Sequence, residues 1–257
     1  MLKGAVVGTQ IDAQATNQLG LTWAYGTHET YLSPDAAQLN CEWVQLCYEE
    51  VFDAATIQRI MALPNYHGAW LLQNEPDLNW GKGVLPQAAA STILQKQIAA
   101  ITAYDPNAKL IVGMGSMYHL PHNRFGNPPY FPQEWDLLPV ATQQRVDGFH
   151  IHIYPGIDTN DLDLMFDPPR TTEAIRGGYR WMKNHGQRDK ELWVSEFGFD
   201  DDTDEGALLL HLPLVYNAIA ALPFMTRLAW FATSWFRYVH LTDTGKLTCA
   251  GKLYSRL

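Results

Sequence analysis

The alternation of short apolar runs with amphipathic segments is the feature that most constrains how this chain can fold. Eight runs have the length and the turn-forming boundaries of buried strands, and we expect them at residues 3–8, 21–25, 43–48, 70–72, 110–113, 146–154, 191–195 and 227–233. Helical patterns fill most of the intervals between them. Eight strands alternating with helices in 257 residues predict an α/β fold, the (β/α)8 TIM barrel, with residues 1–257 as a single domain.

Helix boundaries follow from capping residues and prolines. Ser33 before Pro34 predicts a helix start, and Asp53 predicts the N-cap of the helix that precedes the fourth strand. Pro213 predicts a kink or a restart in the last of the longer helices. The longer helices are expected at residues 86–103, 134–142, 171–185 and 205–221. An open, doubly wound sheet is the alternative fold, but no glycine-rich phosphate loop follows the first strand.

Composition and charge exclude several classes of function. Hydrophobic residues make up 47% of the chain and charged residues only 18%, which is enough for a large core. The net charge of −9 argues against a nucleic-acid partner, because binding phosphates needs clustered Lys and Arg. No apolar run approaches the roughly 18 residues of a membrane span, and residues 1–8 enter a strand too directly to be a signal peptide. We therefore expect a soluble protein without a membrane partner, secreted only if a leader has been removed.

Two of the expected strands each end in a glutamate. The apolar run from Trp70 to Leu72 leads into Asn74-Glu75-Pro76, where the proline stops the strand because it cannot donate to a ladder. The seventh strand ends in Ser195-Glu196-Phe197-Gly198. In parallel α/β folds, the carboxyl ends of the strands carry the chemistry. A single glutamate at a strand end is usually an ordinary solvent-exposed residue. The two motifs together, however, predict a catalytic pair, Glu75 and Glu196.

Two carboxyl groups that face each other across a barrel mouth can cleave an acetal. One of them, kept protonated, gives a proton to the leaving oxygen, and the other, ionised, attacks the sugar carbon. Asn74 directly precedes Glu75, so its amide is expected to bind the sugar hydroxyl next to the reacting carbon. Both half-reactions consist of acid–base and nucleophilic steps, so the expected chemistry implies no cofactor.

The order and spacing of these motifs resemble the retaining glycoside hydrolases of the large (β/α)8 clan, clan A. The resemblance covers nearly the whole chain and implies that Glu75 is the acid/base, Glu196 the nucleophile and Asn74 the sugar-binding amide. The His-Ile-Tyr-Pro sequence that begins at His152 resembles the motif that closes the sixth strand in many members. It implies that Tyr154 contacts the nucleophile and that His152 lines the catalytic subsite. The reaction implied is a double displacement, with the two carboxyl groups about 5–5.5 Å apart.

Within that clan, the compact layout is most similar to the family 128 β-1,3-glucanases. The similarity rests on Thr22-Trp23-Ala24-Tyr25 in the second strand, on Asn-Glu-Pro-Asp, and on Trp230-Phe231 in the eighth strand. It implies an endo-β-1,3-glucanase. The chain departs from that family at Cys47-Tyr48-Glu49-Glu50, where Leu-Trp-Gly is usual, so a family 39-type enzyme or another β-glycosidase of the clan is the alternative. Exo-action would follow if the loop at residues 118–132 blocked one end of the cleft.

Aromatic residues near strand ends are candidates for sugar-binding subsites. The chain has nine Trp and twelve Tyr, and the C–H faces of pyranose rings pack on flat aromatic surfaces. Trp80 is the strongest candidate because its loop follows Glu75 directly, whereas Trp70 and Trp193 lie mid-strand and are expected in the core. Together with Asn74, the residues assigned to substrate binding are His152, Tyr154, Trp23, Tyr25, Trp80, Trp230 and Trp235.

A metal-dependent hydrolase is the main chemical alternative. His150 and His152 alternate along the sixth strand and so point to the same side, and His119 and His122 follow the fifth strand. We disfavour a metal site because no His-Glu-x-x-His is present and no histidine lies on the first strand. The aspartates within residues 200–204 lack an EF-hand pattern. The three cysteines have no Cys-x-x-Cys spacing and predict neither a zinc site nor a disulfide framework.

A catalytically inactive barrel that only binds carbohydrate is the alternative from a different class. Such a barrel is expected to lack one of the two glutamates, and this chain has both Glu75 and Glu196. The expected partner is therefore an oligo- or polysaccharide substrate, bound by a monomer. Glu49 and Glu50, which end the third strand, are further carboxylates near the mouth, for which a hydrogen bond to sugar is the expected role.

Overall fold

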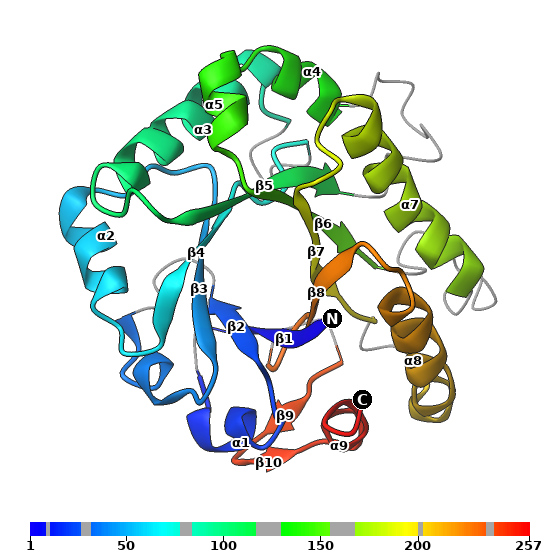
Figure 1. The fold of residues 1–257 in the computed structure, drawn as a ribbon. Coiled ribbons are helices and arrows are strands. Elements are labelled where there is room, and N and C mark those ends of the chain that lie inside the picture. The colour runs from blue at the N-terminus through cyan, green and yellow to red at the C-terminus, as the bar shows by residue number, and fades with distance from the viewer. Residues whose placement is uncertain are drawn as a thin grey trace.

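The structure is a computed structural model that describes residues 1–8, 11–26, 32–77, 84–116, 130–154, 168–199, 203–234 and 239–257. Eight parallel strands close into a barrel in chain order, with β8 paired to β1 (Figure 1). The strands are β1 (Leu2–Val7), β2 (Trp23–Gly26), β3 (Glu42–Cys47), β4 (Tyr66–Leu72), β5 (Lys109–Ser116), β6 (Gly148–Ile153), β7 (Glu191–Phe197) and β8 (Met225–Trp230). The predicted (β/α)8 barrel is confirmed, and each strand lies within a few residues of its expected position.

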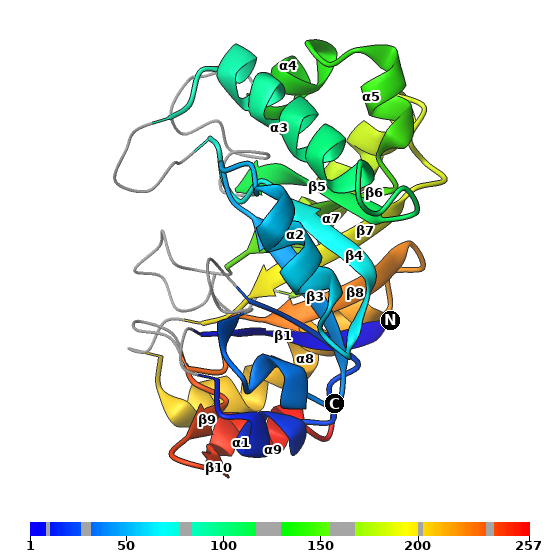
Figure 2. The same cartoon turned by 90° about the vertical axis from the view of Figure 1, so that its left-hand side faces the viewer.

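Helices form the outer layer around the strands (Figure 1). Seen from the side, α3, α4 and α5 cover one flank of the barrel, and α1, α8 and α9 lie on the opposite flank (Figure 2). The helices are α1 (Ala13–Asn17), α2 (Ala54–Met61), α3 (Gln87–Thr102), α4 (Tyr130–Asp136), α5 (Val140–Arg145), α7 (Pro168–Asn184), α8 (Glu205–Ala220) and α9 (Cys249–Tyr254). A two-stranded hairpin of β9 (Thr242–Asp243) and β10 (Lys246–Leu247) precedes α9.

Three local predictions differ from the structure. The helix expected after Ser33 is only a short 3-10 turn, η2 (Ala36–Gln38). The single helix expected at residues 134–142 is two helices, α4 and α5, because Pro139 disfavours a helical conformation in the residue before it and begins the second helix. α8 continues through Pro213 and does not restart there. The Asp53 cap is confirmed, since its carboxylate accepts a 2.8 Å hydrogen bond from the N–H of Thr56.

Strand side chains alternate between two separate cores. On β4, Ala69 and Leu71 point into the barrel, while Trp70 and Leu72 point outward to the layer of helices. The expected apolar face of α3 is buried against this outer surface: Ala90, Leu94, Ile98 and Ile101. The smaller inner core fills the barrel, so that the barrel is a packed structure and not a pore.

The amino end of the barrel is closed by large side chains and an ion pair. Trp23 begins β2, and its ring lies 5.3 Å from that of Trp193 on β7. The guanidinium of Arg227 lies 4.2 Å from the centroid of the Trp193 ring and pairs with the Glu42 carboxylate at 2.7 Å. Trp23, Trp193 and Arg227 are buried, so this end of the barrel is packed with side chains that contact one another.

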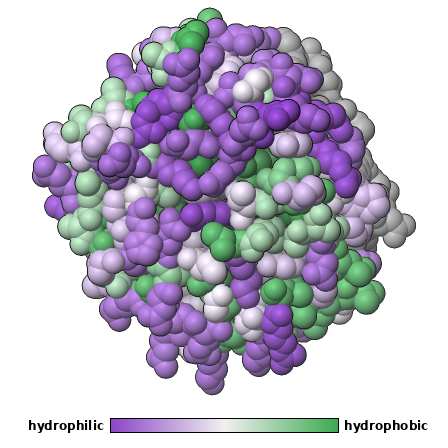
Figure 3. Space-filling model, in the orientation of Figure 1, coloured by the Kyte–Doolittle hydropathy of each residue, from purple (hydrophilic) through white to green (hydrophobic). Residues whose placement is uncertain are grey.

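The surface seen in Figure 3 is mostly hydrophilic, with hydrophobic residues gathered at the lower right, the side on which α8 lies in Figure 1. α8 carries two exposed leucines, Leu210 and Leu214, one helical turn apart. Within the described ranges, no helix is both long enough and apolar enough for a bilayer crossing.

Candidate active site

Glu75 reaches the barrel mouth because the chain turns sharply after β4. Gln73 has a φ of 61°, the left-handed region that non-glycine residues seldom adopt. Its side chain leaves the barrel and donates a 2.9 Å hydrogen bond to the carbonyl of Ala90 on α3. This bond anchors the turn, and Asn74 and Glu75 follow it as buried polar residues. The strained residue immediately before a buried amide and carboxylate is typical of a functional site.

Glu196 reaches the same mouth by means of a β-bulge. Trp193 points into the barrel and Val194 points outward, so strict alternation would turn Glu196 outward as well. The pairing of β6 with β7 shifts at this point: Ile151 pairs with Val194, but the next residue, His152, pairs with Glu196. One extra residue, Ser195, is thereby accommodated, and the bulge directs Glu196 inward.

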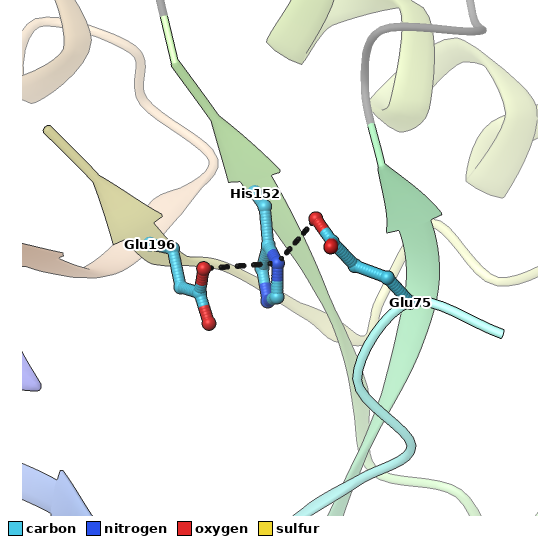
Figure 4. Close-up of side chains that lie close together, drawn as sticks. All are labelled: Glu75, His152 and Glu196. Atoms are coloured by element: carbon cyan, nitrogen blue, oxygen red, sulfur yellow. Dashed lines mark hydrogen bonds and ion pairs between the residues drawn. The ribbon is translucent and has the colours of Figure 1, made fainter. Parts of the chain in front are cut away.

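One histidine joins the two carboxylates (Figure 4). Nδ1 of His152, on β6, lies 2.9 Å from Oε1 of Glu75 and 3.2 Å from Oε2 of Glu196. The three side chains are buried, and one ligand atom from each lies within 4.8 Å of the others. We call these three residues the mouth trio. Their arrangement brings two carboxyl groups to the two sides of one imidazole.

The Glu196 carboxylate is held by two further hydroxyl groups. Tyr25 donates to Oε1 at 3.0 Å, and Tyr154 donates to Oε2, the contact expected for it from the sequence. Burial and the nearby Glu75 raise the pKa of Glu196, while the charge of His152 and the two phenol hydroxyls oppose this; on balance the pKa lies above its usual value. Three polar contacts, with Tyr25, Tyr154 and His152, therefore orient Glu196 and lower its pKa against the effect of burial.

His152 is the basic member of the trio. Burial lowers its pKa, but the charges of Glu196 and Glu75 and the hydrogen bond to Glu75 outweigh burial, and its pKa lies above the usual 6.5. Nε2 of the ring is buried and makes no hydrogen bond to any residue that the structure describes. Oδ1 of Asn74 is likewise buried and makes no hydrogen bond to a described residue. A donor and an acceptor are thus left unused beside the two carboxylates, which suits a polar ligand with hydroxyl groups.

His150 connects the two strand ends beneath the trio, a role that the sequence did not predict. Its Nδ1 lies 2.7 Å from Oγ of Ser195, and its Nε2 lies 3.1 Å from the carbonyl of Gln73. Burial, followed by the charge of His152, lowers the pKa of His150 to about 3, so the ring is neutral. Nε2–H therefore donates to the carbonyl, and Nδ1 accepts from the Ser195 hydroxyl. Both ring nitrogens of His150 are therefore engaged in hydrogen bonds that join the ends of β4 and β7.

Two tryptophans that we assigned to substrate binding lie away from the mouth. Trp23 is at the amino end, where its Nε1 donates to the carbonyl of Leu2, and it has no exposed surface. Trp230 points outward, since its neighbour Ala229 points inward, and its Nε1 donates to the carbonyl of Val239. Both assignments are corrected, because a side chain without exposed surface offers no face to a sugar. The same correction applies to Tyr25, which has no exposed surface and whose hydroxyl donates to Glu196.

The mouth contains Phe231 in place of Trp230. Phe231 belongs to the inner core, and its ring meets that of Tyr154 edge to face at a centroid distance of 5.8 Å. The sequence contained a signal for this orientation, because residues 227, 229 and 231 fall on one side of a chain that alternates as β8 does. Of the other expected contact residues, Trp80 and Trp235 lie outside the described residues, as do His119 and His122.

Glu49, which follows β3, contacts the turn that leads from β4 to Glu75. Its Oε1 accepts a hydrogen bond of 3.4 Å from the backbone N–H of Asn74. The carbonyl of Glu50 is held at 2.8 Å by the Gln97 amide of α3, and the Glu50 side chain is exposed. The contact of Glu49 with the backbone was not expected, and it gives this carboxylate a structural role beside Glu75.

The mouth trio is also the one group of described His, Cys, Asp and Glu side chains whose ligand atoms gather closely enough for a metal ion. Two carboxylates and one imidazole are ligands that zinc accepts. The same three groups also contact one another, with Nδ1 of the imidazole 2.9 and 3.2 Å from oxygens of the two carboxyl groups.

Comparison with solved structures defines first the class of fold, a barrel shared with carbohydrate-active proteins. No protein-family model and no curated protein sequence matches the chain. An endo-β-1,3-glucanase of glycoside hydrolase family 128 from Amycolatopsis mediterranei, in complex with laminaritriose, matches with a TM-score of 0.70 and 18% identity over 99% of this chain and 98% of that one.

Two further structures of that family carry other descriptions. A curdlan-specific exo-β-1,3-glucanase from Blastomyces gilchristii, in complex with glucose, matches with a TM-score of 0.66 and 18% identity over 100% of this chain and 98% of that one. An oligosaccharide-binding protein from Trichoderma gamsii matches with a TM-score of 0.59 and 16% identity over 97% of this chain and 92% of that one. At these identities, the likeness shows that the fold is shared.

Proposed function

We propose that this chain is a retaining glycoside hydrolase that cleaves β-1,3-glucan internally, with Glu75 as acid/base and Glu196 as nucleophile. The observation that carries the proposal is the mouth trio, in which one imidazole bridges two buried carboxylates whose oxygens lie within 4.8 Å. Retaining enzymes hold their carboxyl groups about 5–5.5 Å apart, whereas inverting enzymes need about 6.5–9.5 Å to admit a water molecule. The close approach favours retention.

The contacts of Glu196 suit a nucleophile. Hydrogen bonds from Tyr25 and Tyr154 stabilise the carboxylate and fix its orientation, so that an oxygen can attack the anomeric carbon. As this bond forms, the bond to the leaving oxygen breaks, and that oxygen takes the proton of Glu75. Water then attacks the glycosyl–enzyme ester, gives its proton to Glu75 and releases Glu196.

The contacts of Glu75 suit an acid that becomes a base. Glu75 faces both the Glu196 carboxylate and the imidazole of His152, whose charge responds to each proton transfer. The unused acceptor of Asn74 and the unused Nε2 of His152 supply hydrogen bonds to the hydroxyl groups of the sugar in the catalytic subsite. Sugar, acid and nucleophile are then held by residues from β4, β6 and β7.

The choice of β-1,3-glucan rests on the fold likeness and the sequence motifs together. The matched endo-glucanase was solved with laminaritriose, and the matched exo-glucanase is described as curdlan-specific. The likeness to an oligosaccharide-binding protein supports a second candidate, a barrel that binds the glycan without cleaving it. Against that candidate, both glutamates are present and in contact with one histidine.

The test is to digest laminari-oligosaccharides and follow the products by proton NMR. We expect the newly formed reducing end to appear first as the β-anomer, and longer substrates to yield internal cleavage products. First appearance of the α-anomer would refute retention, and release of glucose alone from chain ends would refute endo-action. Binding without cleavage by the wild-type protein would support the second candidate.

Azide rescue then assigns the two roles. With azide, Glu196→Ala should yield an α-glycosyl azide, because azide replaces the nucleophile in a single inversion. Glu75→Ala should yield a β-glycosyl azide, because azide needs no general base to attack the glycosyl–enzyme. The matched control is Glu173→Gln on the exposed surface of α7, which should keep full turnover. The reverse pattern of azide products would exchange the roles of the two glutamates.

A further inference from the structure

His150 is a buried side chain that the proposed reaction does not use. It lies on β6 two residues before His152, so both side chains point to the same side of the strand. The centroids of the two imidazole rings are 5.6 Å apart. Because His150 comes earlier on the strand, its ring lies one layer further from the carboxyl end of the barrel than the ring of His152.

Each ring nitrogen of His150 contacts one of the two irregular backbone segments that lead to the catalytic glutamates. Nδ1 lies 2.7 Å from Oγ of Ser195, the residue that the bulge accommodates directly before Glu196. Nε2 lies 3.1 Å from the carbonyl oxygen of Gln73, the residue with a φ of 61° in the turn before Glu75. One planar ring thus joins the two places at which the backbone departs from regular strand geometry.

The groups that face the ring determine where its proton lies. Nε2 faces two carbonyl oxygens, that of Gln73 at 3.1 Å and that of Leu72 at 3.4 Å, and since a carbonyl only accepts, Nε2 carries the proton. The Ser195 hydroxyl can donate to the lone pair that a neutral ring has on Nδ1. Burial, followed by the charge of His152, lowers the pKa of His150 to about 3, which agrees with a neutral ring. The bridge therefore runs from the Ser195 hydroxyl through the imidazole to the Gln73 carbonyl.

Gly113 on β5 provides the space in which the ring and the turn meet. It pairs with His150 in the register of β5 and β6. A Cβ atom at this position would lie 3.1 Å from Nε2 of His150, 3.1 Å from the carbonyl oxygen of Gln73 and 3.2 Å from that of Asn74. All three separations are shorter than ordinary van der Waals contact, so a side chain here would push the ring or the turn aside by a few tenths of an ångström.

Two backbone segments that are fixed to one rigid ring hold their side chains at a fixed distance. That distance matters, because a retaining enzyme holds its carboxyl groups about 5–5.5 Å apart and a misplacement of about 1 Å can cost about 10²-fold in rate. The contacts of His152 with the carboxyl groups change with each proton transfer. Those of His150 join a hydroxyl and a carbonyl that take no part in the reaction, so they persist throughout it.

We propose that His150 is a positioning residue that bridges Ser195 and Gln73 and thereby sets the distance between the carboxyl groups of Glu75 and Glu196. The effect on catalysis rests on the proposed function, because it is expressed through the two glutamates. The effect of the bridge on the geometry of the mouth trio does not rest on that function, and it is measured first and without substrate.

The first experiment follows the Nδ1–H proton of His152 by NMR in protein labelled with 15N-histidine. The resonance of this proton depends on the contacts of 2.9 and 3.2 Å that Nδ1 makes with the two carboxyl groups, and His152→Gln identifies it by its loss. Ser195→Ala removes the bridging hydroxyl and leaves the mouth trio in place. We expect the resonance to move upfield in Ser195→Ala, because a longer hydrogen bond deshields its proton less.

The control for this measurement is Thr16→Ala, which removes a buried hydroxyl on α1 in the outer layer of helices. Its spectrum should show the His152 resonance at the position of wild type. An unchanged resonance in Ser195→Ala, or an equal shift in Thr16→Ala, would overturn the proposal whether or not the protein cleaves a glycan.

The second experiment is a double-mutant cycle on kcat and KM with a laminari-oligosaccharide. His150→Gln keeps an N–H for the Gln73 carbonyl but removes the acceptor for Ser195, and Ser195→Ala removes the other partner of that contact. We expect each variant to lower kcat about tenfold with little change in KM, because the sugar-binding groups remain in place. The double variant should lose no more than either single variant, since both break one contact. Losses that multiply, or single variants with the kcat of wild type, would overturn the positioning role.

Gly113→Ala tests the same distance without removing a hydrogen-bonding group. We expect kcat to fall about tenfold and the His152 resonance to move, because the added methyl group displaces the ring or the turn. Gly177→Ala on α7 is the matched control, since its Cβ would lie 3.8 Å from the Arg180 side chain, an ordinary contact. It should keep both values of wild type. Wild-type kcat and an unmoved resonance in Gly113→Ala would likewise overturn the proposal.

Discussion

The two ends of the barrel differ in how their charged groups are paired. At the amino end, charges of opposite sign meet: Arg227 pairs with Glu42 at 2.7 Å, and Lys109 pairs with Glu191 at 2.6 Å. At the mouth, two carboxylates face each other, and a single imidazole lies between them. β7 spans both situations, because Glu191 begins this strand and Glu196 is its last residue but one.

The pKa values of these two glutamates move in opposite directions. Burial raises the pKa of Glu191, but hydrogen bonds from Lys109 and Trp193 and the charges of Lys109 and Arg227 lower it below its usual value. The pKa of Glu196 lies above its usual value, because burial and Glu75 outweigh its partners. Pairs of opposite charge stabilise the fold. Two like charges held close together destabilise it, and such an arrangement is typical of a site that transfers protons.

The largest expected difference is between glutamine substitutions at the two ends of β7. Glu196→Gln should lower kcat at least about 10²–10⁴-fold, because a neutral amide cannot form the glycosyl ester. Glu191→Gln should leave kcat within about twofold, because its carboxylate is hydrogen-bonded to Lys109 and Trp193 at the start of β7, at the opposite end of the strand from the mouth. Steady-state rates on a laminari-oligosaccharide measure both. Similar losses in the two variants would mean that Glu196 acts through the fold alone.

The next largest effect should be on stability at the amino end. Arg227→Met removes one partner of a largely buried ion pair and leaves the Glu42 carboxylate uncompensated, at a cost of about 3 kcal/mol in the free energy of unfolding. Urea denaturation at pH 7 measures this loss.

The double variant with Glu42→Gln is the control for that experiment. It should recover part of the lost stability, since no unpaired carboxylate then remains. Below the unfolding transition, kcat of Arg227→Met should stay close to that of wild type. A stable variant with low kcat would contradict the division between the two ends.

Sequence patterns predicted the barrel and the two glutamates because those features are local. Glu75 was found where an apolar run stops at Pro76, and Glu196 where another run stops before Gly198. The direction of each side chain could not be predicted from local pattern. It depends on the bulge at Ser195 and on the left-handed turn at Gln73, which are fixed by pairing with neighbouring strands and by contacts with α3.

The aromatic residues show that an error of one position along a strand assigns a side chain to the wrong face. Trp230 and Phe231 are adjacent, and only the register of β8 decides that Phe231 faces the mouth. Glu134 gave no signal at all, since an acidic residue on a short helix is usually exposed. Its side chain is nonetheless fully buried in the structure.

The smallest of the three effects concerns the hydrogen bonds that hold Glu196. Tyr154→Phe removes a donor that lowers the pKa of this carboxyl group, so the pKa should rise further. Because the nucleophile must be ionised, the acidic limb of kcat/KM should move to higher pH, and kcat/KM near that limb should fall about tenfold.

The pH profile distinguishes an electrostatic role for Tyr154 from a merely structural one. Tyr104→Phe, at an exposed position on the surface, is the matched control and should give the wild-type profile. If Tyr154→Phe lowers kcat/KM equally at every pH, its hydroxyl positions Glu196 without stabilising the charge. If only the acidic limb of the profile moves, the hydroxyl stabilises the negative charge of Glu196. Hydrogen-bond donors would then do at the mouth what Arg227 does at the amino end, which is to stabilise a carboxylate.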